Sequence, residues 1–248
     1  MKIKSGIPGL DALLFGGIPA RSMVLLSGSA GTGKTIFSLQ FLVGGAKLKE
    51  RGVYITFEEL PDKIYDQGDQ LGWDLKGLEK KGLLKVVSIS SVNIVDILVT
   101  VRDLIRDFKP QRMVIDSLTY MSLVAHALGK IVDLEKTSVA EVYGQMTNVS
   151  SPLESDGLAV RKMITDFVKI LQQRNITALL TSEVQRESVW YSRDTLSEFA
   201  CDGIFHLKAI SIGADLQRTL EIVKMRNTKI KGGIYTYEIT DKGVKVKA

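Results

Sequence analysis

The segment from Gly28 to Thr35 has the residue types and spacing of a phosphate-binding loop. It reads Gly-Ser-Ala-Gly-Thr-Gly-Lys-Thr, which fits the pattern G-x-x-x-x-G-K-[ST] at every fixed position. An apolar run at 23–26 precedes it, and a helix-like stretch follows it. Glycines let successive backbone N–H groups point at one anion, and the helix that follows adds the positive end of its dipole. We therefore expect contacts to a nucleotide from Gly28, Ser29, Ala30, Gly31, Thr32, Gly33, Lys34, Thr35 and Ile36.

The side chains near this loop predict that the nucleotide binds together with Mg²⁺. Lys34 would reach the β- and γ-phosphates, and the Thr35 hydroxyl would bind the metal. A second apolar run, 113–115, ends in Asp116, where a P-loop protein places a carboxylate that holds Mg²⁺, usually through water. An Asp at a strand end is also a common helix cap, but the P-loop upstream favours the metal role. Thr35 and Asp116 are the expected metal ligands.

Glu58 and Glu59 stand at the end of the apolar run Val53–Phe57 and predict a general base. Hydrolysis needs a group that orients and polarises a water in line with the γ-phosphate, and a carboxylate at the end of a neighbouring strand can do this. Adjacent side chains of a strand point to opposite faces, so one glutamate is expected to face the phosphate. We assign Glu58 as the base, with Glu59 open as the alternative. The other glutamate of the pair would support the base or the metal, or would complement the dipole of the helix that begins near Pro61.

The rest of the chain alternates strand-like and helix-like segments, which predicts an α/β fold with a mainly parallel twisted sheet flanked by helices. Strands are expected at Met23–Ser27, Val53–Phe57, Leu84–Ser88, Met113–Asp116, Ala178–Ser182, Gly203–Lys208, Thr219–Met225 and Thr236–Thr240. Helices are expected at Ile36–Lys49, Pro61–Leu71, Ile94–Phe108 and Val160–Arg174. No helix-like segment follows Cys201, and the last three strands are expected to add antiparallel at one edge of the sheet.

Composition limits the class of protein. The chain has 248 residues, of which 45% are apolar, and it shows no repeat or Pro-rich linker, so we expect one domain over residues 1–248. No run approaches the roughly 18 apolar residues that cross a membrane, and no signal-peptide core follows Met1, which predicts a cytoplasmic protein. Cys201 is the single cysteine and has neither a disulfide partner nor zinc-site spacing. The net charge of +5 resides in residues 208–248, either as solvated lysines or as cations that meet phosphate.

Further motifs along the chain are similar to those of one known family. They are Ser5-Gly6-Ile7-Pro8-Gly9-Leu10-Asp11, Leu13-Leu14-Phe15-Gly16-Gly17-Ile18-Pro19, Phe57-Glu58-Glu59, Leu71-Gly72-Trp73-Asp74-Leu75, Lys224-Met225-Arg226 and Thr240-Asp241-Lys242-Gly243. Together with the P-loop they extend over nearly the whole chain, which resembles the KaiC-like and RadA-related branch of the RecA-type ATPases. The resemblance implies a RecA-like P-loop NTPase fold, with antiparallel strands at the carboxyl-terminal edge and ATP as the nucleotide.

The resemblance also implies a homo-oligomer, a hexameric ring or a filament, with ATP bound between protomers. Lys224 and Arg226 would then act in trans on the γ-phosphate held by a neighbour. The open alternative for this pair is an exposed position on an edge strand. Thr240 and Asp241, in the closing turn, would contact the nucleotide, and Ser182 would sense the γ-phosphate.

The chain departs from the family pattern at several positions. Asn227 follows the K-x-R pair where a glycine is usual, and Ile230 stands where a histidine often contacts the nucleotide. Glu183 occupies the place of the recombinase glutamine, where phosphate would repel it unless it is linked to metal or turned away. The chain carries one such domain, whereas KaiC has two in tandem.

Two segments are expected to correspond to the central-channel loops of recombinases. The first, residues 120–157, is longer than an ordinary connection. The second runs from Val184 to Phe199, and its Arg186, Trp190, Tyr191 and Arg193 combine cations with stacking rings, as binding of single-stranded DNA requires. The alternative is that Trp190 and Tyr191 pack against a neighbouring subunit or the protein's own core.

These patterns predict a Mg²⁺-dependent ATPase that works as an oligomer and uses hydrolysis to switch its assembly or a partner, with a recombinase role in DNA repair as an extension. The alternative is a KaiC-like scaffold or signalling regulator that binds ATP, hydrolyses little of it and binds no nucleic acid. The glutamate pair favours catalysis. Autokinase activity on Ser or Thr is a third hypothesis, for which the sequence places no acceptor.

Overall fold

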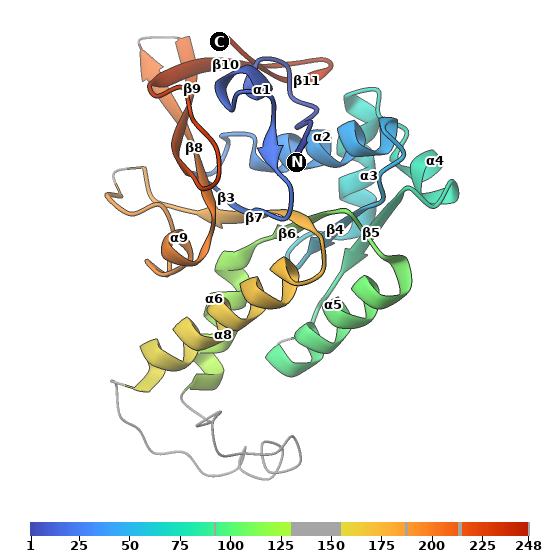
Figure 1. Ribbon diagram of the computed structural model, residues 1–248, viewed down its shortest axis with the longest axis vertical. Helices are drawn as coiled ribbons and strands as arrows, with labels where there is room; N and C mark the ends of the chain where they lie inside the picture. Colours follow the sequence, from blue (N-terminus) through green and yellow to red (C-terminus); the bar gives the residue numbers. More distant parts are fainter. Residues whose placement is uncertain (92, 130–154, 187, 213–214, 248) are drawn as a thin grey trace.

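The strand that leads into the P-loop lies inside a nine-stranded sheet (Figure 1). The computed structural model describes residues 1–91, 93–129, 155–186, 188–212 and 215–247. In spatial order the strands are β11 (Gly243–Val246), β10 (Ile234–Thr240), β9 (Asp215–Met225), β8 (Gly203–Ile212), β3 (Met23–Gly28), β7 (Thr177–Glu183), β6 (Arg112–Asp116), β4 (Gly52–Thr56) and β5 (Leu84–Ser88). Neighbouring strands from β8 to β5 are parallel, whereas β9, β10 and β11 add antiparallel at one edge.

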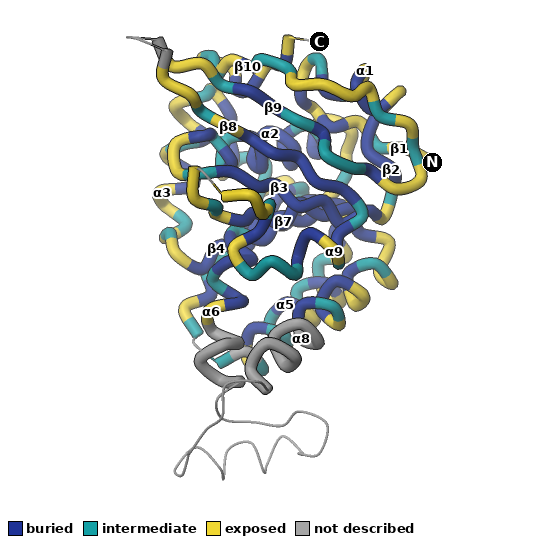
Figure 2. The backbone as a smooth tube through the Cα atoms, turned by 90° about the vertical axis from the view of Figure 1, so that its left-hand side faces the viewer, coloured by how far each residue is buried: buried dark blue, intermediate teal, exposed yellow. Residues whose placement is uncertain are grey.

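Helices cover both faces of this sheet (Figure 1). One face carries α1 (Leu10–Leu13), α2 (Lys34–Lys47), α3 (Pro61–Gln70) and α4 (Leu75–Lys80), and the other carries α5 (Ile94–Phe108), α6 (Leu118–Gly129) and α8 (Ser155–Gln172). Side chains alternate along the strands, so Val24 and Leu26 join the core on the α2 face, and Met23 and Leu25 join the core on the α6 face. The middle of the sheet is therefore buried on both faces, as the dark strands in Figure 2 show.

Each expected strand and helix is present, with bounds that differ by a few residues, which confirms the mainly parallel α/β class. One expected pairing was wrong. The strand predicted at Gly203–Lys208 does not add antiparallel to the sheet: β8 pairs in parallel with β3, with Leu25 opposite Ile204, and only its other edge is antiparallel. Hydrophobic periodicity indicates a strand but not its neighbours, which explains the error.

Part of the long segment predicted at 120–157 is helical. Its first residues continue α6, and its last residues form the start of α8. The middle of the segment, 130–154, lies outside the described residues. The short elements β1 (Lys2–Ile3), β2 (Ile18–Pro19), α1, α4, α9 (Ser197–Ala200) and β11 were also not predicted. Within the described ranges, no helix has both the length and the apolar character to cross a membrane.

Glycines let the amino-terminal signature lie directly on the P-loop helix. A Cβ on Gly6 would lie 2.8 Å from the Cα of Gly44 in α2, and a Cβ on Gly44 would lie 2.6 Å from the Cα of Gly6. Within this signature, the Ser5 backbone N–H donates to Asp11 Oδ1 at 2.9 Å, which joins the start and the end of the amino-terminal arm, residues 5–11. The two backbones thus touch, and the contact joins the amino-terminal arm to the helix that follows the P-loop.

We predict that Gly44→Ala lowers the free energy of unfolding by about 1–3 kcal/mol, because the new methyl group would overlap backbone that has no rotamer to change. The intrinsic preference of a helix for alanine over glycine, about 1 kcal/mol, acts in the opposite direction. Urea unfolding followed by circular dichroism measures the difference. Gly232→Ala is the control, since nothing lies within 4 Å of its added Cβ. A Gly44→Ala protein as stable as the wild type would contradict this packing.

Candidate nucleotide-binding and catalytic site

The P-loop connects the carboxyl end of β3 to the first residue of α2. Gly31 and Gly33 have positive φ values of 78° and 86°, a conformation that L side chains rarely adopt, so the turn depends on glycine at both positions. Strand β10 braces the loop from outside: the Tyr237 hydroxyl donates to the Thr32 carbonyl, and a Cβ on Gly33 would lie 2.6 Å from Ile239 Cδ1. The predicted loop is therefore present in its expected strand-to-helix context and is held by the antiparallel edge of the sheet.

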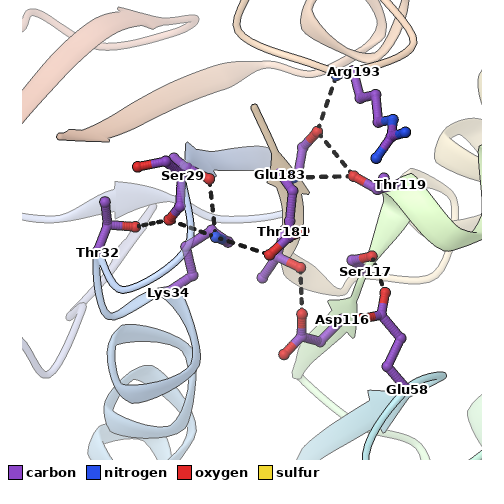
Figure 3. Close-up of polar contacts among 12 residues, drawn as sticks. Ser29, Thr32, Lys34, Glu58, Asp116, Ser117, Thr119, Thr181, Glu183 and Arg193 are labelled. Carbon is purple, nitrogen blue, oxygen red and sulfur yellow. Dashed lines mark hydrogen bonds and ion pairs between the residues drawn. The ribbon is translucent and has the colours of Figure 1, made fainter. Parts of the chain in front are cut away.

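The Lys34 ammonium lies inside this turn (Figure 3). It donates to the carbonyls of Gly28 at 2.9 Å and Ser29 at 3.0 Å, and it lies 3.7 Å from Glu183 Oε1. Only 8% of the residue is exposed. Burial lowers the pKa of Lys34, and the negative charge of Glu183 opposes this shift. Acceptors of the protein itself thus hold the cation where a phosphate would otherwise bind.

Asp116 is held by hydroxyl groups on both of its carboxylate oxygens. Thr181 Oγ1 donates to Oδ1 at 2.6 Å, and the Tyr54 hydroxyl donates to Oδ2. Thr35 also lies close enough to the Tyr54 hydroxyl to act on its pKa, so both expected metal ligands are near one tyrosine. Burial, followed by the charge of Asp116, raises the pKa of Tyr54 well above its ordinary value. Tyr54 is therefore a hydrogen-bond donor at any physiological pH.

The donor set at this position fits Mg²⁺ bound together with a nucleotide. Asp116 and Thr35 are half-buried and supply only oxygen atoms, the ligand type that Mg²⁺ prefers. Among the described residues there is no group of three or more His, Cys, Asp or Glu that would form a complete metal cage. This pattern is typical of Mg²⁺ sites, which use one or two carboxylates and take their remaining ligands from phosphates and water.

The two glutamates after β4 diverge. Glu58 Oε1 accepts a hydrogen bond from Ser117 Oγ at 3.2 Å, which places Glu58 beside the end of β6 (Figure 3). Glu59 turns toward α3, where Gln67 Nε2 donates to Glu59 Oε2 at 3.5 Å. The chain can separate them because β4 ends at Thr56, whose hydroxyl accepts from the Glu59 backbone N–H at 3.0 Å. Only Glu58 is close enough to Lys34 for its charge to act on the lysine pKa.

Alternation along β7 divides its last residues between two environments. Thr181 and Glu183 face Asp116 and Lys34, whereas Ser182 faces α6, where its hydroxyl lies 3.4 Å from Thr119 Oγ1. Ser182, the expected γ-phosphate sensor, therefore points to the α6 side of the strand, and Thr181 is the residue that faces Asp116. Successive side chains of a strand point oppositely, so the sequence could have indicated this difference.

Lys224 and Arg226 lie at the end of the sheet opposite the P-loop. Lys224 is opposite Ile204, which is itself beside Leu25, while the P-loop begins three residues further along β3. A β-bulge at this point turns Lys224 toward α9, where its Nζ donates to the Glu198 carbonyl at 2.6 Å. Arg226 forms an ion pair with Asp202 at 3.5 Å. Both cations thus have their partners on the α9 side of the sheet and not at the P-loop.

The closing turn between β10 and β11 contains Thr240 and Asp241. The Thr240 hydroxyl donates to the Gly243 carbonyl at 2.9 Å, which closes the turn. The preceding residue, Ile239, packs on Gly33 of the P-loop. Thr240 and Asp241 are thus carried next to the P-loop by the same strand, although no contact between them and the loop's side chains is present.

The 184–199 segment is partly exposed and partly folded back. Arg186 and Arg193 are exposed, and Trp190 is 47% exposed. Tyr191 differs from them because its ring packs edge-on against the buried His206, with centroids 5.2 Å apart. Tyr191 thus packs against the protein's own core, which was the alternative to a role in binding single-stranded DNA.

The site contains residues that sequence reasoning did not select. Tyr54 and Thr181 hold Asp116, and Tyr237 holds the P-loop. For Tyr54 and Thr181, the only indication in the sequence was the alternation of side chains along each strand. Tyr54 lies on the same face of β4 as Thr56, and Thr181 lies on the same face of β7 as Glu183. A tyrosine within the apolar run 53–57 reads as an ordinary core residue, which explains why Tyr54 was missed.

Comparison with known proteins agrees with this geometry. The family profile described as "ATPase: KaiC" matches residues 3–143 and 145–248. A UPF0273 protein of Pyrococcus horikoshii is 34% identical over 243 residues, which cover 98% of this chain and 92% of that protein. The circadian clock oscillator protein KaiC of Synechococcus elongatus is 30% identical over 99% of this chain, but only 44% of that longer protein is covered.

The fold is similar to a solved structure as well. The crystal structure of a KaiC-like protein from the hyperthermophilic archaeon Pyrococcus horikoshii superimposes with a TM-score of 0.80 and 29% identity, and covers 100% of this chain and 99% of that one. The profile match, the relatives and the P-loop site with its strand-end carboxylates lead to one conclusion. The chain belongs to the KaiC family of ATPases and carries that family's nucleotide-binding domain on a RecA fold.

Proposed function

We propose that the protein hydrolyses ATP in a Mg²⁺-dependent reaction. The observation that carries the proposal is the convergence of Lys34, Asp116 and Glu58 at the carboxyl edge of the parallel sheet. Three carboxylates, those of Glu183, Asp116 and Glu58, act electrostatically on the single Lys34 ammonium. Such a site would repel a polyanionic nucleotide unless a divalent cation binds with it, which supports a requirement for Mg²⁺.

Each side chain has a physical role in this proposal. Lys34 would leave the Gly28 and Ser29 carbonyls and bind the β- and γ-phosphates. Its charge stabilises negative charge on the phosphate more strongly in a buried site than in water. Thr35 and Asp116 would hold Mg²⁺, which supplies neutralisation of the charge that develops on the phosphate oxygens. Glu58 would accept the proton of the water that attacks the γ-phosphorus, and the Ser117 hydroxyl holds its carboxylate in place.

We predict that Glu58→Gln reduces steady-state ATP turnover by a factor on the order of 10² or more, because the amide cannot accept the proton. Glu59→Gln is the matched control and should lose less than about tenfold, since its carboxylate faces Gln67. Both variants should bind a fluorescent ATP analogue as the wild type does, whereas Lys34→Ala should bind it weakly. Unchanged turnover in a Glu58→Gln/Glu59→Gln double variant would favour the scaffold function, and a larger loss with Glu59→Gln would reverse the assignment.

We propose further that the active form is a homo-oligomer in which Lys224 and Arg226 act on a neighbour's nucleotide. Their position at the far end of the sheet from their own P-loop supports this arrangement. Arg226 is about half exposed. Besides the ion pair with Asp202, its guanidinium donates to the Phe199 carbonyl at 3.4 Å. The exposed guanidinium can therefore turn toward an adjacent protomer. A residue of this kind stabilises transition-state charge in trans.

A mixing experiment tests this arrangement. Arg226→Ala and Glu58→Gln subunits, each inactive alone, should recover part of the wild-type turnover when mixed, because some interfaces then combine an intact P-loop side with an intact cation side. A mixture of Glu58→Gln with Lys34→Ala is the control and should recover nothing, since both changes damage the same side of the site. Full activity of a monomer at every protein concentration would refute the proposal.

A second candidate function is binding of single-stranded nucleic acid by the 184–199 segment. Two acidic side chains of the segment are engaged internally: Asp194 accepts hydrogen bonds from the backbone of Leu196 and Ser197, both at 2.7 Å, and the buried Glu198 accepts from the Tyr191 backbone at 2.7 Å. Arg186, Trp190 and Arg193 are left facing solvent. An aromatic side chain with exposed cations beside it is the combination that binds a single strand of nucleic acid.

We predict that a labelled oligonucleotide binds in the presence of ATP and that salt weakens the binding. Trp190→Ala/Arg193→Ala should weaken it by about tenfold, since stacking on one ring contributes roughly 1–3 kcal/mol per base. Fluorescence anisotropy at low and moderate salt measures the affinity. Lys245→Ala, an exposed cation on β11, is the control for general charge effects. No binding at low salt, or equal binding by the double variant, would assign the segment to protein contacts instead.

A further inference from the structure

One buried tyrosine hydroxyl is hydrogen-bonded to a residue that is expected to hold the metal. Tyr54 is fully buried on β4, which lies between β6 and the edge strand β5. Its hydroxyl donates to Asp116 Oδ2 and lies close enough to Thr35 for that residue to act on the tyrosine pKa. Asp116 and Thr35 are half-buried, so the two expected ligands reach the surface of the site while the tyrosine stays behind them.

The hydrogen bonds of Asp116 leave a defined part of the carboxylate free. A carboxylate has two oxygens and about four lone-pair positions. Tyr54 occupies one on Oδ2 and Thr181 occupies one on Oδ1, at 2.6 Å. Both donors come from inside the sheet, on neighbouring strands to either side of β6. The remaining lone pairs are therefore free to accept a ligand, and the carboxylate is near enough to the P-loop for its charge to act on Lys34.

We propose that Tyr54 is a positioning residue, whose buried hydroxyl, opposite that of Thr181, fixes the Asp116 carboxylate in the orientation that binds the divalent cation accompanying the nucleotide. The inference rests on the proposed function, because it assumes that Asp116 and Thr35 hold Mg²⁺. Loss of a group that orients a metal ligand typically lowers metal affinity by about 10–100-fold. Tyr54 also lies close to Thr35, so one hydroxyl is near both expected ligands.

The neighbouring charge explains why Asp116 needs to be held. Lys34 is close enough for the charge of Asp116 to act on its pKa. A carboxylate free to rotate would turn toward that ammonium, since opposite charges attract strongly where water is scarce. The two hydroxyl donors oppose this rotation. Loss of either donor should therefore cost metal affinity and leave the backbone cradle for phosphate intact.

The test is a Mg²⁺ titration of nucleotide binding by wild type, Tyr54→Phe and Thr181→Val, with a fluorescent ADP analogue as the probe. In EDTA we expect all three proteins to bind the analogue with affinities within about twofold. On addition of Mg²⁺, the midpoint of the affinity increase should lie about tenfold or more higher in each variant. Tyr65→Phe is the matched control, because it removes a tyrosine hydroxyl that is bonded to Glu79, between α3 and α4.

The outcomes separate this inference from the proposed function. If wild-type binding does not respond to Mg²⁺, the metal site and the proposed function fail together. If wild type responds and Tyr54→Phe has the same midpoint, the positioning role alone is overturned. A Tyr54→Phe protein that fails to fold, or that loses the same affinity in EDTA as with Mg²⁺, also overturns it, since the hydroxyl would then be structural. An unchanged midpoint in Thr181→Val would contradict the role of Thr181 as the second donor that orients Asp116.

Discussion

A buried cation at the carboxyl edge of the sheet is the constraint on which the rest of the site depends. The Lys34 ammonium is almost fully covered, and a charge removed from water is costly unless other charges or dipoles replace its hydration. Two carbonyls of the P-loop and the Glu183 carboxylate provide that replacement. The turn must therefore curl tightly enough to bring its own carbonyls to the lysine, and glycines allow this. A nucleotide would enter by taking over the role of these acceptors.

Strand β7 connects this constraint to the surface. Thr181 holds Asp116, and two residues later Glu183 pairs with Lys34, while the Ser182 hydroxyl between them lies 3.4 Å from the Arg193 backbone nitrogen, which donates to it. The exposed 184–199 segment leaves the sheet at this point. The residues that contact Asp116 and Lys34 and the start of the segment are therefore carried by the same strand end.

The sequence was sufficient for the parts of the site in which local pattern and chemistry coincide. The P-loop, the strand ending at Asp116 and the separation of the two glutamates after β4 could be predicted because each depends on a few adjacent residues. Thr181, Tyr54 and Tyr237 could not, because their roles depend on which strands are neighbours and which face of each is turned to the loop. Leu118–Gly129 was not predicted as a helix because it is apolar on nearly all sides and lacks the alternation that marks a surface helix.

The contact between Gly6 and Gly44 has a consequence for how the chain can change. When two side chains pack too tightly, a larger residue on one side is usually accommodated by a smaller residue on the other. Here both partners are already glycine and the atoms that meet are backbone, so no residue small enough exists to compensate for either. Neither glycine can therefore be replaced first and compensated later by a change in the other. A larger residue at either position requires the whole amino-terminal arm to move.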